Sequence, residues 1–277
     1  MRIMYVTDLH GDERKYRKAL DVARARDVEA VVNGGDMYPK DIALEQQHAF
    51  ITAFLDRHFT EYERSGIYYL CMPGNDDLAT FDELFDSTCR AYTHVFNIAQ
   101  RKVTLGGFEF VGFNLVADYP FGLKDRCRMD TARAEFPEQL GLPVVSDGSW
   151  PEFRGLKPLD DWFAFARAMP TIEDELKCLE KPRNPKKAIY VIHMPPSRLG
   201  LDVCFDGSEA GSQAVRSFLV ETQPRLALHG HIHESPQVSG AWKVRLGHTV
   251  SVQPGQMKRL TYVIMDLNSM EMERVVE

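Results

Sequence analysis

The stretch that decides the fold is RIMYVTDLH, residues 2–10, where an apolar run ends at a carboxylate and an imidazole. Ile3–Thr7 has the length and apolar character of a buried strand. Asp8 and His10 follow at the carboxyl end of that strand. Four further apolar runs, each with polar residues behind it, are predicted to form strands of the same kind: Ala30–Val32, Ile67–Met72, Ala188–Ile192 and Arg225–Leu228.

Helical patterns separate these strands. Tyr16–Arg26 carries apolar residues at helical spacing, and Leu44–Arg64 has the pattern of a long amphipathic helix. Leu78–Phe85 and Ser212–Thr222 predict two shorter helices. Because strands alternate with helices, we expect a parallel α/β sheet.

Other parts of the chain carry antiparallel signals. Val103–Leu105 and Phe108–Phe113 flank the turn Gly106-Gly107 and predict a β-hairpin. Three more strands are predicted near the carboxyl end, at Lys243–Leu246, Thr249–Val252 and Thr261–Leu267. We therefore expect an α/β protein with either one mixed sheet or two packed sheets, and with helices outside.

Residues 114–187 do not follow this alternation. They contain eight prolines, and a loop of this length within a compact domain is often a lid or a binding element. Helices are predicted within it at Pro158–Ala168 and Thr171–Leu179. The expected organisation is a single domain over residues 1–277, with 114–187 as an insertion or cap.

Composition and charge limit the class of protein. A chain of 277 residues that is 44% hydrophobic can bury one large core. A formal charge of −7 argues against a protein surface that binds nucleic acids or anionic membranes in general, because such a surface would need a stripe of basic residues. The five cysteines are odd in number and form no C-x-x-C pair, which argues against a disulfide framework or a zinc ribbon.

The amino terminus enters a predicted strand directly, without the pattern of a signal peptide. No stretch has the apolar length needed to cross a bilayer. Together with cysteines that we expect to be reduced, these features predict a cytoplasmic protein. The oligomeric state is left open by the sequence.

The polar residues behind the strands form a set. Asp8, Asp36, Asn75 and His193 each follow a predicted strand, and open α/β sheets bind ligands at the carboxyl ends of their strands. The run His229-Gly230-His231-Ile232-His233 adds three histidines, and imidazole suits transition metals. Carboxylate, amide and imidazole groups from five points of the chain are what a two-metal hydrolytic site needs.

Each signature also has a purely structural interpretation. Gly35-Asp36 is typical of a simple loop. Asn75-Asp76-Asp77 makes a good helix N-terminus, with Asp76 or Asp77 as the cap. His193 is compatible with a core histidine. Unrelated polar residues would not all be expected to follow predicted strands. The joint pattern therefore favours a shared site.

The order of these signatures resembles that of the calcineurin-like metallophosphoesterase superfamily: Asp8-x-His10, Gly35-Asp36, Gly74-Asn75, His193 and Gly230-His231-x-His233. The resemblance spans nearly the whole domain. It implies a four-layer α/β/β/α sandwich of two mixed sheets, with a dinuclear metal centre between the sheet edges.

By motif position, the resemblance implies metal-binding roles for seven residues. Ligands of the first metal correspond to Asp8, His10 and His233, those of the second to Asn75, His193 and His231, and the bridging carboxylate to Asp36. His229 lies outside the motif and is interpreted as a supporting residue. Gln253-Pro254-Gly255 resembles a late Asn-Pro-Gly turn of the family, with glutamine in place of asparagine.

The ligand types suit phosphate chemistry. Two divalent ions, the carboxylates Asp8 and Asp36 and a bridging hydroxide would leave a charge of about +1, which favours an anionic phosphate. Carboxylate, amide and imidazole ligands suit Mn²⁺, Fe²⁺ or Zn²⁺ better than Mg²⁺, and we expect Mn²⁺ to work in vitro. The predicted function is a metal-dependent phosphoesterase that hydrolyses a small phosphate ester.

One residue departs from the family pattern. Many members carry a histidine directly after this asparagine, and that histidine is taken to protonate the leaving oxygen; here Asp76 stands in its place. An ionised Asp76 could not donate a proton, and it would repel a dianionic monoester more than a monoanionic diester. We therefore name Asp76 as a candidate catalytic residue and favour diesters or nucleotide-like substrates. The helix-cap interpretation of Asp76 stays open.

Three other functions are considered, and one of them, a phosphoprotein phosphatase, is disfavoured by the missing histidine. Members that split a pyrophosphate bond in a nucleotide-diphosphate conjugate also lack this histidine, and they would need an apolar groove. A non-catalytic scaffold on the same fold is disfavoured, because such members lose ligands and this chain retains all seven.

A short basic run lies within residues 114–187. Lys124-Asp125-Arg126-Cys127-Arg128 is typical of a solvated turn. Its functional interpretation is a lid in which Arg126 or Arg128 binds the non-reacting part of the substrate.

Overall fold

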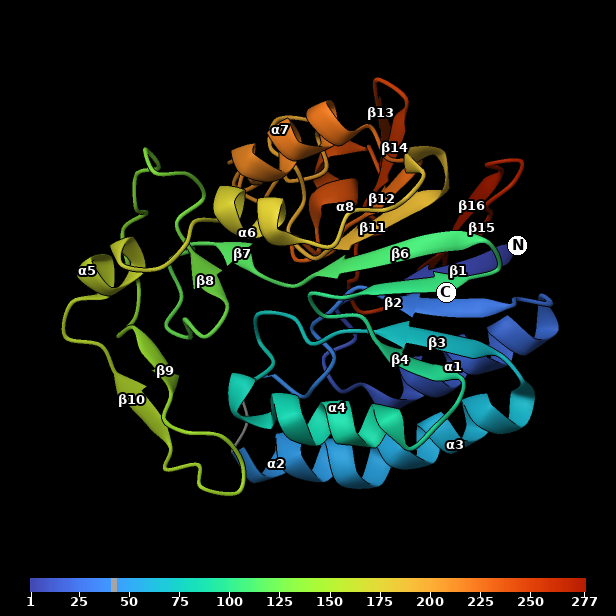
Figure 1. Cartoon of the computed structure of the whole chain (residues 1–277), viewed down its shortest axis with the longest axis horizontal. Coiled ribbons are helices and arrows are strands. Elements are labelled where there is room, and N and C mark those ends of the chain that lie inside the picture. The colour runs from blue at the N-terminus through green and yellow to red at the C-terminus, as the bar shows by residue number, and fades with distance from the viewer. Residues whose placement is uncertain (41–43) are drawn as a thin grey trace.

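Two six-stranded mixed sheets pack face to face at the centre of the structure (Figure 1). The computed structural model describes residues 1–40 and 44–277. The first sheet has the order β16-β15-β1-β2-β3-β4, in which β1 to β4 are parallel and the two strands at the other edge are antiparallel. Its strands are β1 (Arg2–Val6), β2 (Ala30–Asn33), β3 (Tyr68–Cys71), β4 (Val95–Asn97), β15 (Thr261–Asp266) and β16 (Met272–Val276).

The second sheet has the order β13-β14-β12-β11-β6-β5. Its four central strands are parallel, and an antiparallel hairpin closes each edge. Its strands are β5 (Lys102–Leu105), β6 (Phe108–Phe113), β11 (Ala188–Ile192), β12 (Leu226–Leu228), β13 (Lys243–Leu246) and β14 (Thr249–Val252). The hairpin predicted at Gly106-Gly107 is confirmed. Two packed sheets are present, so the single mixed sheet is wrong.

Helices cover the outer face of each sheet, which confirms the predicted four-layer sandwich (Figure 1). Against the first sheet lie α1 (Glu13–Ala25), α2 (Leu44–Ala49), a π-helical stretch (Phe50–Leu55), α3 (Asp56–Ser65), a 3₁₀ turn (Ala79–Phe81) and α4 (Asp82–Arg90). Against the second lie α6 (Ile172–Cys178) and α7 (Gln213–Thr222), and the short α8 (Ser235–Ser239) follows β12. The long helix predicted over Leu44–Arg64 is thus one run whose middle is π-helical.

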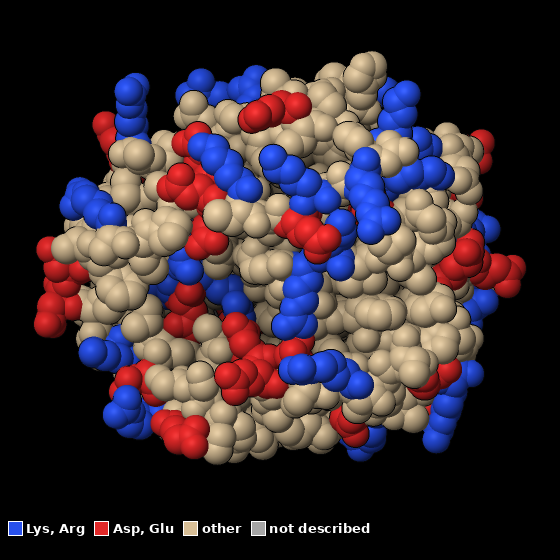
Figure 2. Space-filling model, viewed as in Figure 1, with Lys and Arg blue, Asp and Glu red and all other residues tan. Residues whose placement is uncertain are grey.

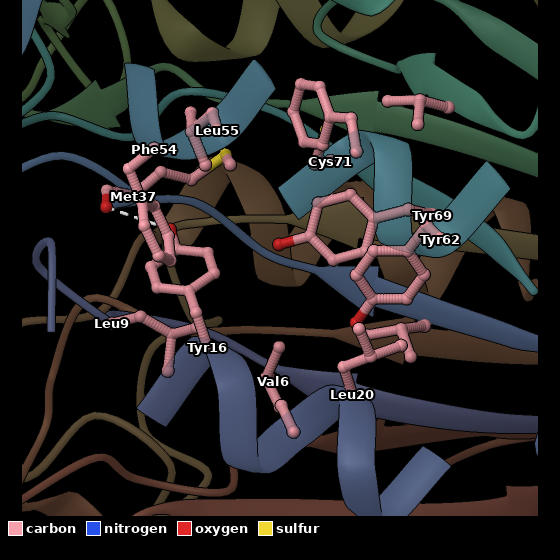
Figure 3. Packing of buried hydrophobic residues seen from close by; sticks show 14 of the residues in the cluster. Val6, Leu9, Tyr16, Leu20, Met37, Phe54, Leu55, Tyr62, Tyr69 and Cys71 are labelled. Carbon is pink, nitrogen blue, oxygen red and sulfur yellow. Dashed lines mark hydrogen bonds between the residues drawn. The ribbon is translucent and has the colours of Figure 1, made fainter. Parts of the chain in front are cut away.

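Strand β1 explains why its apolar run is continuous rather than alternating. Ile3 and Tyr5 enter the core between the two sheets, whereas Met4 and Val6 enter the core beneath the helices. A strand that is buried on both faces needs apolar residues at every position. Figure 3 shows the helix-side core, where Tyr16 of α1 donates a hydrogen bond to the carbonyl of Met37 (2.8 Å).

Residues 114–187 lie beside the end of the sandwich at which the parallel strands finish (Figure 1). They form β7 (Val116–Ala117), β8 (Cys127–Arg128), β9 (Val144–Ser146), β10 (Leu156–Pro158), α5 (Trp162–Arg167), α6 and a 3₁₀ turn (Pro185–Lys187). Val116, Cys127 and Trp162 belong to a small core of their own. Helix α6 instead packs with α7 on the second sheet. The division into one domain with an insertion stays a prediction.

Helix α5 is shorter than predicted, because Pro158 pairs with Val144 in the β9–β10 ribbon and the helix begins after the cap Asp161. Strands β4 and β16, and the short strands β7 to β10 within residues 114–187, were not predicted. No helix in the described part of the chain is long and apolar enough to cross a membrane. All five cysteines are free.

Neither Asp76 nor Asp77 caps the helical segment behind them, so that interpretation is wrong. The carboxylate of Asp125 accepts a hydrogen bond from the backbone N–H of Ala79 (2.9 Å) instead. Asp77 accepts from the backbone N–H groups of Met37 (2.8 Å) and Gly74 (2.6 Å). Asp77 therefore ties the loop behind β2 to the loop behind β3.

His58 of α3 is buried in the helix-side core. Its ring stacks on Phe54 (centroids 5.4 Å apart) and meets Tyr62 edge-on (5.0 Å). Burial, together with the positive charges of Arg17 and Arg24, lowers the pKa of His58 from 6.5 to about 3. Below pH 6.5 the unfolded chain binds a proton here that the folded chain does not. Stability is therefore lost as the pH falls toward 3.

The substitution His58→Phe keeps a buried ring and removes this titration. Between pH 7 and pH 5, we expect the wild type to lose about 2 kcal/mol more unfolding free energy than the variant. Urea unfolding curves at the two pH values measure the difference. An equal loss in both proteins would contradict the assignment of this pH dependence to His58.

Candidate metal centre

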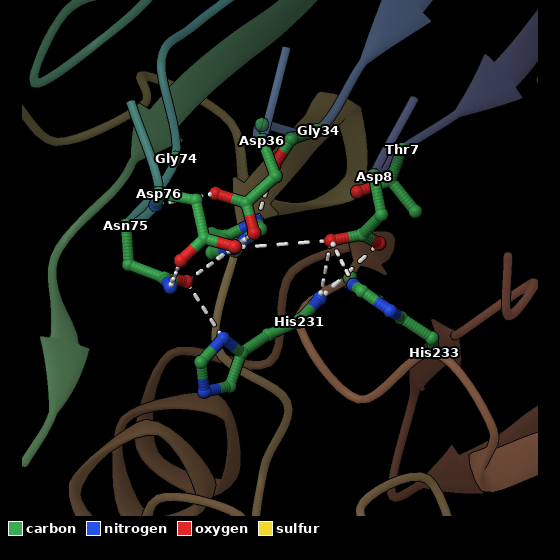
Figure 4. Close-up of polar contacts among 12 residues, drawn as sticks. Thr7, Asp8, Gly34, Asp36, Gly74, Asn75, Asp76, His231 and His233 are labelled. Atoms are coloured by element: carbon green, nitrogen blue, oxygen red, sulfur yellow. Dashed lines mark hydrogen bonds and ion pairs between the residues drawn. The ribbon is translucent and has the colours of Figure 1, made fainter. Parts of the chain in front are cut away.

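The predicted ligands meet where five strands end. Asp8 follows β1, Asp36 follows β2, Asn75 follows β3 and His193 follows β11. His231 and His233 lie in the loop behind β12. Figure 4 shows these loops side by side, with the side chains of Asp8, Asp36, Asn75 and His231 directed toward a common centre. The convergence expected from the strand ends is therefore present.

The backbone at this rim is strained. Asp8, His10, Asp36 and His231 have positive φ angles of 55°, 43°, 50° and 70°. Such conformations cost a non-glycine residue on the order of 1 kcal/mol or more and cluster at functional sites. Hydrogen bonds hold the strained loops together: the N–H of Asp8 donates to the carbonyl of Gly35, and that of His10 to Asp36 (2.9 Å each).

Two glycines allow the loops to approach one another. A Cβ atom at Gly74 would collide with the backbone and carboxylate of Asp36. A Cβ atom at Gly230 would collide with Thr7 and the carboxylate of Asp8. Any side chain at either position would therefore push a carboxylate out of the site.

The ligand atoms fall into two groups that share one residue. Asp8, His10, Asp36 and His233 form the first group, and Asp36, His193 and His231 form the second. The Nε2 atoms of His10 and His233 lie 3.0 Å apart. The amide oxygen of Asn75 joins the second group, 2.9 Å from His193 Nε2 and 2.7 Å from His231 Nδ1. This division matches the two ligand sets and the bridging position implied by the motifs.

Asp8 and Asp36 are each only 1% exposed. Burial alone would raise the pKa of Asp8, but His233 and His193 lower it to about 2. His193 and His10 likewise hold the pKa of Asp36 well below its usual range against the effect of burial. Both carboxylates are therefore ionised at neutral pH.

The histidines differ in protonation. Burial lowers the pKa of His10 to about 4 and that of His231 to about 3, so both rings are neutral at pH 7 and present a lone pair. For His193, the charges of Asp36 and Asp8 outweigh burial and raise the pKa to about 9. A cation bound among these groups would replace that proton.

A sequence model of the calcineurin-like phosphoesterase family matches residues 1–235. The chain belongs to the calcineurin-like phosphoesterase family. This superfamily uses a dinuclear divalent metal centre. No curated protein matches the chain.

Solved structures share the fold of this calcineurin-like phosphoesterase. The protein TT1561 of Thermus thermophilus is 17% identical, with 99% of this chain and 98% of that chain covered and a TM-score of 0.60. A dimetal phosphatase from Danio rerio is 10% identical, with 100% and 95% covered and a TM-score of 0.55. At such identities the similarity concerns the fold alone.

The donor set fits two divalent ions. In the part of the chain that the structure describes, the only ion-pair partners of Asp8 and Asp36 are histidines. Two carboxylates buried this closely need positive charge beside them. Oxygen and imidazole donors in two groups around a shared carboxylate supply the places where such ions would bind.

Asp76 lies at the edge of this centre. Its backbone N–H donates to Asp36 (2.9 Å), and its carboxylate is 2.8 Å from the ammonium of Lys40 and 3.9 Å from His10 Nδ1. The amide of Asn75 also donates to it (3.0 Å). Burial and the charge of Asp36 raise the pKa of Asp76 to about 6, although Lys40 opposes the shift.

Arg126 and Arg128 do not reach the site. The guanidinium of Arg126 donates to the carbonyl of Gly74 (2.8 Å) and forms an ion pair with Asp82 (2.5 Å). Arg128 lies 3.7 Å from Glu175. Neither arginine lines the cavity at the metal ligands. The predicted substrate contacts are therefore wrong: Arg126 fixes the loop that carries Asn75 to α4.

Sequence patterns missed several residues of the site. Lys40 and Tyr119 line the same cavity, and the ring of Tyr119 meets His231 edge-on (centroids 5.7 Å apart). Gln256 donates to the carbonyl of Thr7 (3.1 Å). Gln253, in the predicted Gln-Pro-Gly turn, donates to the carbonyl of Gly230. Of these residues, only Gln253 belongs to a motif that the sequence analysis identified.

Removing the shared carboxylate should disrupt both groups. After EDTA treatment and reconstitution with Mn²⁺, we expect the wild type to hold about two ions per chain. Asp36→Asn should lose at least one ion and more than about 100-fold of the hydrolysis of bis(p-nitrophenyl) phosphate. Elemental analysis and initial rates measure these quantities.

Asp21→Asn is the matched control, because its side chain is 75% exposed on α1, outside the site. It should keep both metal content and activity. Full metal content in Asp36→Asn would refute the bridging role.

Proposed function

We propose that this calcineurin-like phosphoesterase is a phosphodiesterase that works with two divalent ions, Mn²⁺ being the expected metal in vitro. When bound, the ions would supply a hydroxide nucleophile and positive charge for the phosphoryl oxygens. Asp8, His10 and His233 would hold the first ion, and Asn75, His193 and His231 the second. Asp36 would contact both.

The protein's own groups orient these ligands. The N–H of His231 donates to both carboxylate oxygens of Asp8 (3.0 and 3.2 Å), and the N–H of Asp76 fixes one oxygen of Asp36. The ring of His193 is held through Nδ1, 2.9 Å from the carbonyl of Gly34. Fixed orientation of this kind favours a preorganised centre rather than one that forms on substrate binding.

The observation that carries the preference for diesters is the Asp76–Lys40 pair. A pKa of about 6 leaves Asp76 mainly ionised at pH 7, and bound cations would lower that pKa further. With the cations bound, such a group would be a poor proton donor to a leaving oxygen. Since Lys40 balances its charge, lost proton donation matters more here than repulsion of a dianion. Diesters with acidic leaving groups depend least on such a proton.

A scaffold without catalysis is the competing function. For a scaffold, the centre would either bind no metal or bind metal without catalysing hydrolysis. The convergence of five further ligand residues on two buried carboxylates supports the enzyme instead.

Restoring an imidazole should shift the substrate preference. In Asp76→His, we expect the ratio of kcat/KM for bis(p-nitrophenyl) phosphate to kcat/KM for phenyl phosphate to fall by about tenfold or more, because the monoester gains a proton donor. Steady-state rates on the two substrates measure the ratio.

Asp76→Asn separates charge from proton donation. It removes the negative charge and adds no acid, so its effect on the ratio should be smaller than that of Asp76→His. An unchanged ratio in Asp76→His would refute the role of Asp76, and an equal shift in both variants would assign it to charge alone.

A further inference from the structure

We propose that the substrate carries a single phosphate, bound at the metal centre, and an uncharged aromatic or other apolar ester group that lies against Phe121 and Phe205. This inference rests on the proposed phosphodiesterase function and adds the class of substrate. It comes from the part of the cavity that the metal ligands do not line.

The cavity is much larger than one phosphate requires. Its volume is about 990 Å³, at the upper end of the range of small-molecule sites. Asp36, Asn75, His231 and His233 line part of it. Two parts of the chain far apart in the sequence line much of the rest: residues within 117–121 and 129–140, on either side of β8, and residues within the loop 204–211 that precedes α7. This remainder has room for an ester group.

Apolar side chains occupy much of that remainder. Phe121, Leu140 and Phe205 are 63%, 72% and 63% exposed, although each lines the cavity. Met129 and Met194 line it as buried residues. Exposed apolar side chains grouped around one cavity favour an apolar ligand, because a ligand that covers them removes apolar surface from water.

The charges of the cavity argue against further anionic groups. Among the described lining residues, Lys40 is the only lysine or arginine, and it is paired with Asp76. Glu135, Glu209 and Glu234, none of which is a predicted metal ligand, contribute further carboxylates to the lining. A second phosphate would meet these carboxylates without a cation to bind it.

The face of the molecule seen in Figure 2 agrees with this picture. On the face shown in Figure 2, basic and acidic side chains alternate, and no broad basic patch surrounds a single site. A polyanionic substrate would gain little from the field of that face. A nucleotide-diphosphate conjugate is therefore the less suitable occupant.

Three inhibitors of bis(p-nitrophenyl) phosphate hydrolysis, measured with the Mn²⁺ enzyme, test the inference. Diphenyl phosphate and dimethyl phosphate carry the same single charge and differ in their apolar groups. Bis(4-sulfophenyl) phosphate keeps the rings and adds a fixed negative charge to the far end of each. Because both ester groups of each inhibitor are alike, the result does not depend on which one meets the phenylalanines.

In the wild type, we expect diphenyl phosphate to bind at least about tenfold more tightly than dimethyl phosphate. Phe121→Ala and Phe205→Ala should each reduce this ratio severalfold. Both side chains are exposed, so their truncation should leave the fold intact. Phe165→Ala on α5, 42% exposed and outside the cavity, is the matched control and should keep the ratio.

The charged inhibitor tests the claim that the substrate carries one phosphate and no further anionic group. Bis(4-sulfophenyl) phosphate should bind at least about tenfold more weakly than diphenyl phosphate. Equal or tighter binding would overturn the claim that the cavity rejects further anions. Equal ratios of diphenyl to dimethyl phosphate in the wild type and both cavity variants would overturn the apolar site.

The failure of the proposed function would look different. If the wild type shows no hydrolysis of bis(p-nitrophenyl) phosphate that is lost in Asp36→Asn, the phosphodiesterase itself is refuted, and the inference with it. If that hydrolysis is present and the inhibitor ratios do not respond to Phe121→Ala or Phe205→Ala, only the inference is refuted.

Discussion

Two buried carboxylates, Asp8 and Asp36, constrain the rest of this structure. Each is nearly inaccessible to water, and among the described residues histidines are their only ion-pair partners. A buried negative charge is costly unless a positive charge lies beside it. The fold holds the pair in place from the ends of β1 and β2, and so it builds a site whose free energy improves when cations enter.

Holding that pair requires strain and close packing elsewhere. Asp8 and Asp36 themselves adopt left-handed backbone conformations. The loops that carry them are tied by backbone hydrogen bonds to each other and by Asp77 to the loop behind β3. Arg126 then anchors that third loop to Asp82. These contacts fix the positions of the three loops relative to one another.

The strands and helices were largely predictable, because their signals are local. Strands β11, β13 and β14 have the predicted bounds, and α1 buries the apolar face expected of it. The ligand rim was predictable for a related reason: parallel strands finish at one edge, so residues behind them meet there. Strands β4 and β16 had weak patterns, and pairing with neighbours decides their state.

Partners that lie far apart in sequence explain the failures. Arg126 looked suited to a substrate because a basic run does not reveal that Asp82 is its partner. Asp76 looked like a helix cap because the true cap, Asp125, comes from another part of the chain. Lys40 had no motif at all. Such pairings depend on which loops the tertiary structure brings together. No local sequence pattern reveals them.

The Asp76–Lys40 pair shows how one such pairing changes the chemistry expected from a motif. From sequence alone, a carboxylate beside the metals adds negative charge and should repel a dianion. In the structure the ammonium lies 2.8 Å away, so the pair is close to neutral, as an uncharged imidazole would be. Under the proposed function, what the site lacks is therefore an acid rather than positive charge. That difference affects the departure of the leaving group more than the binding of phosphate, so under the proposed function the choice of ester group would fall to the apolar part of the cavity.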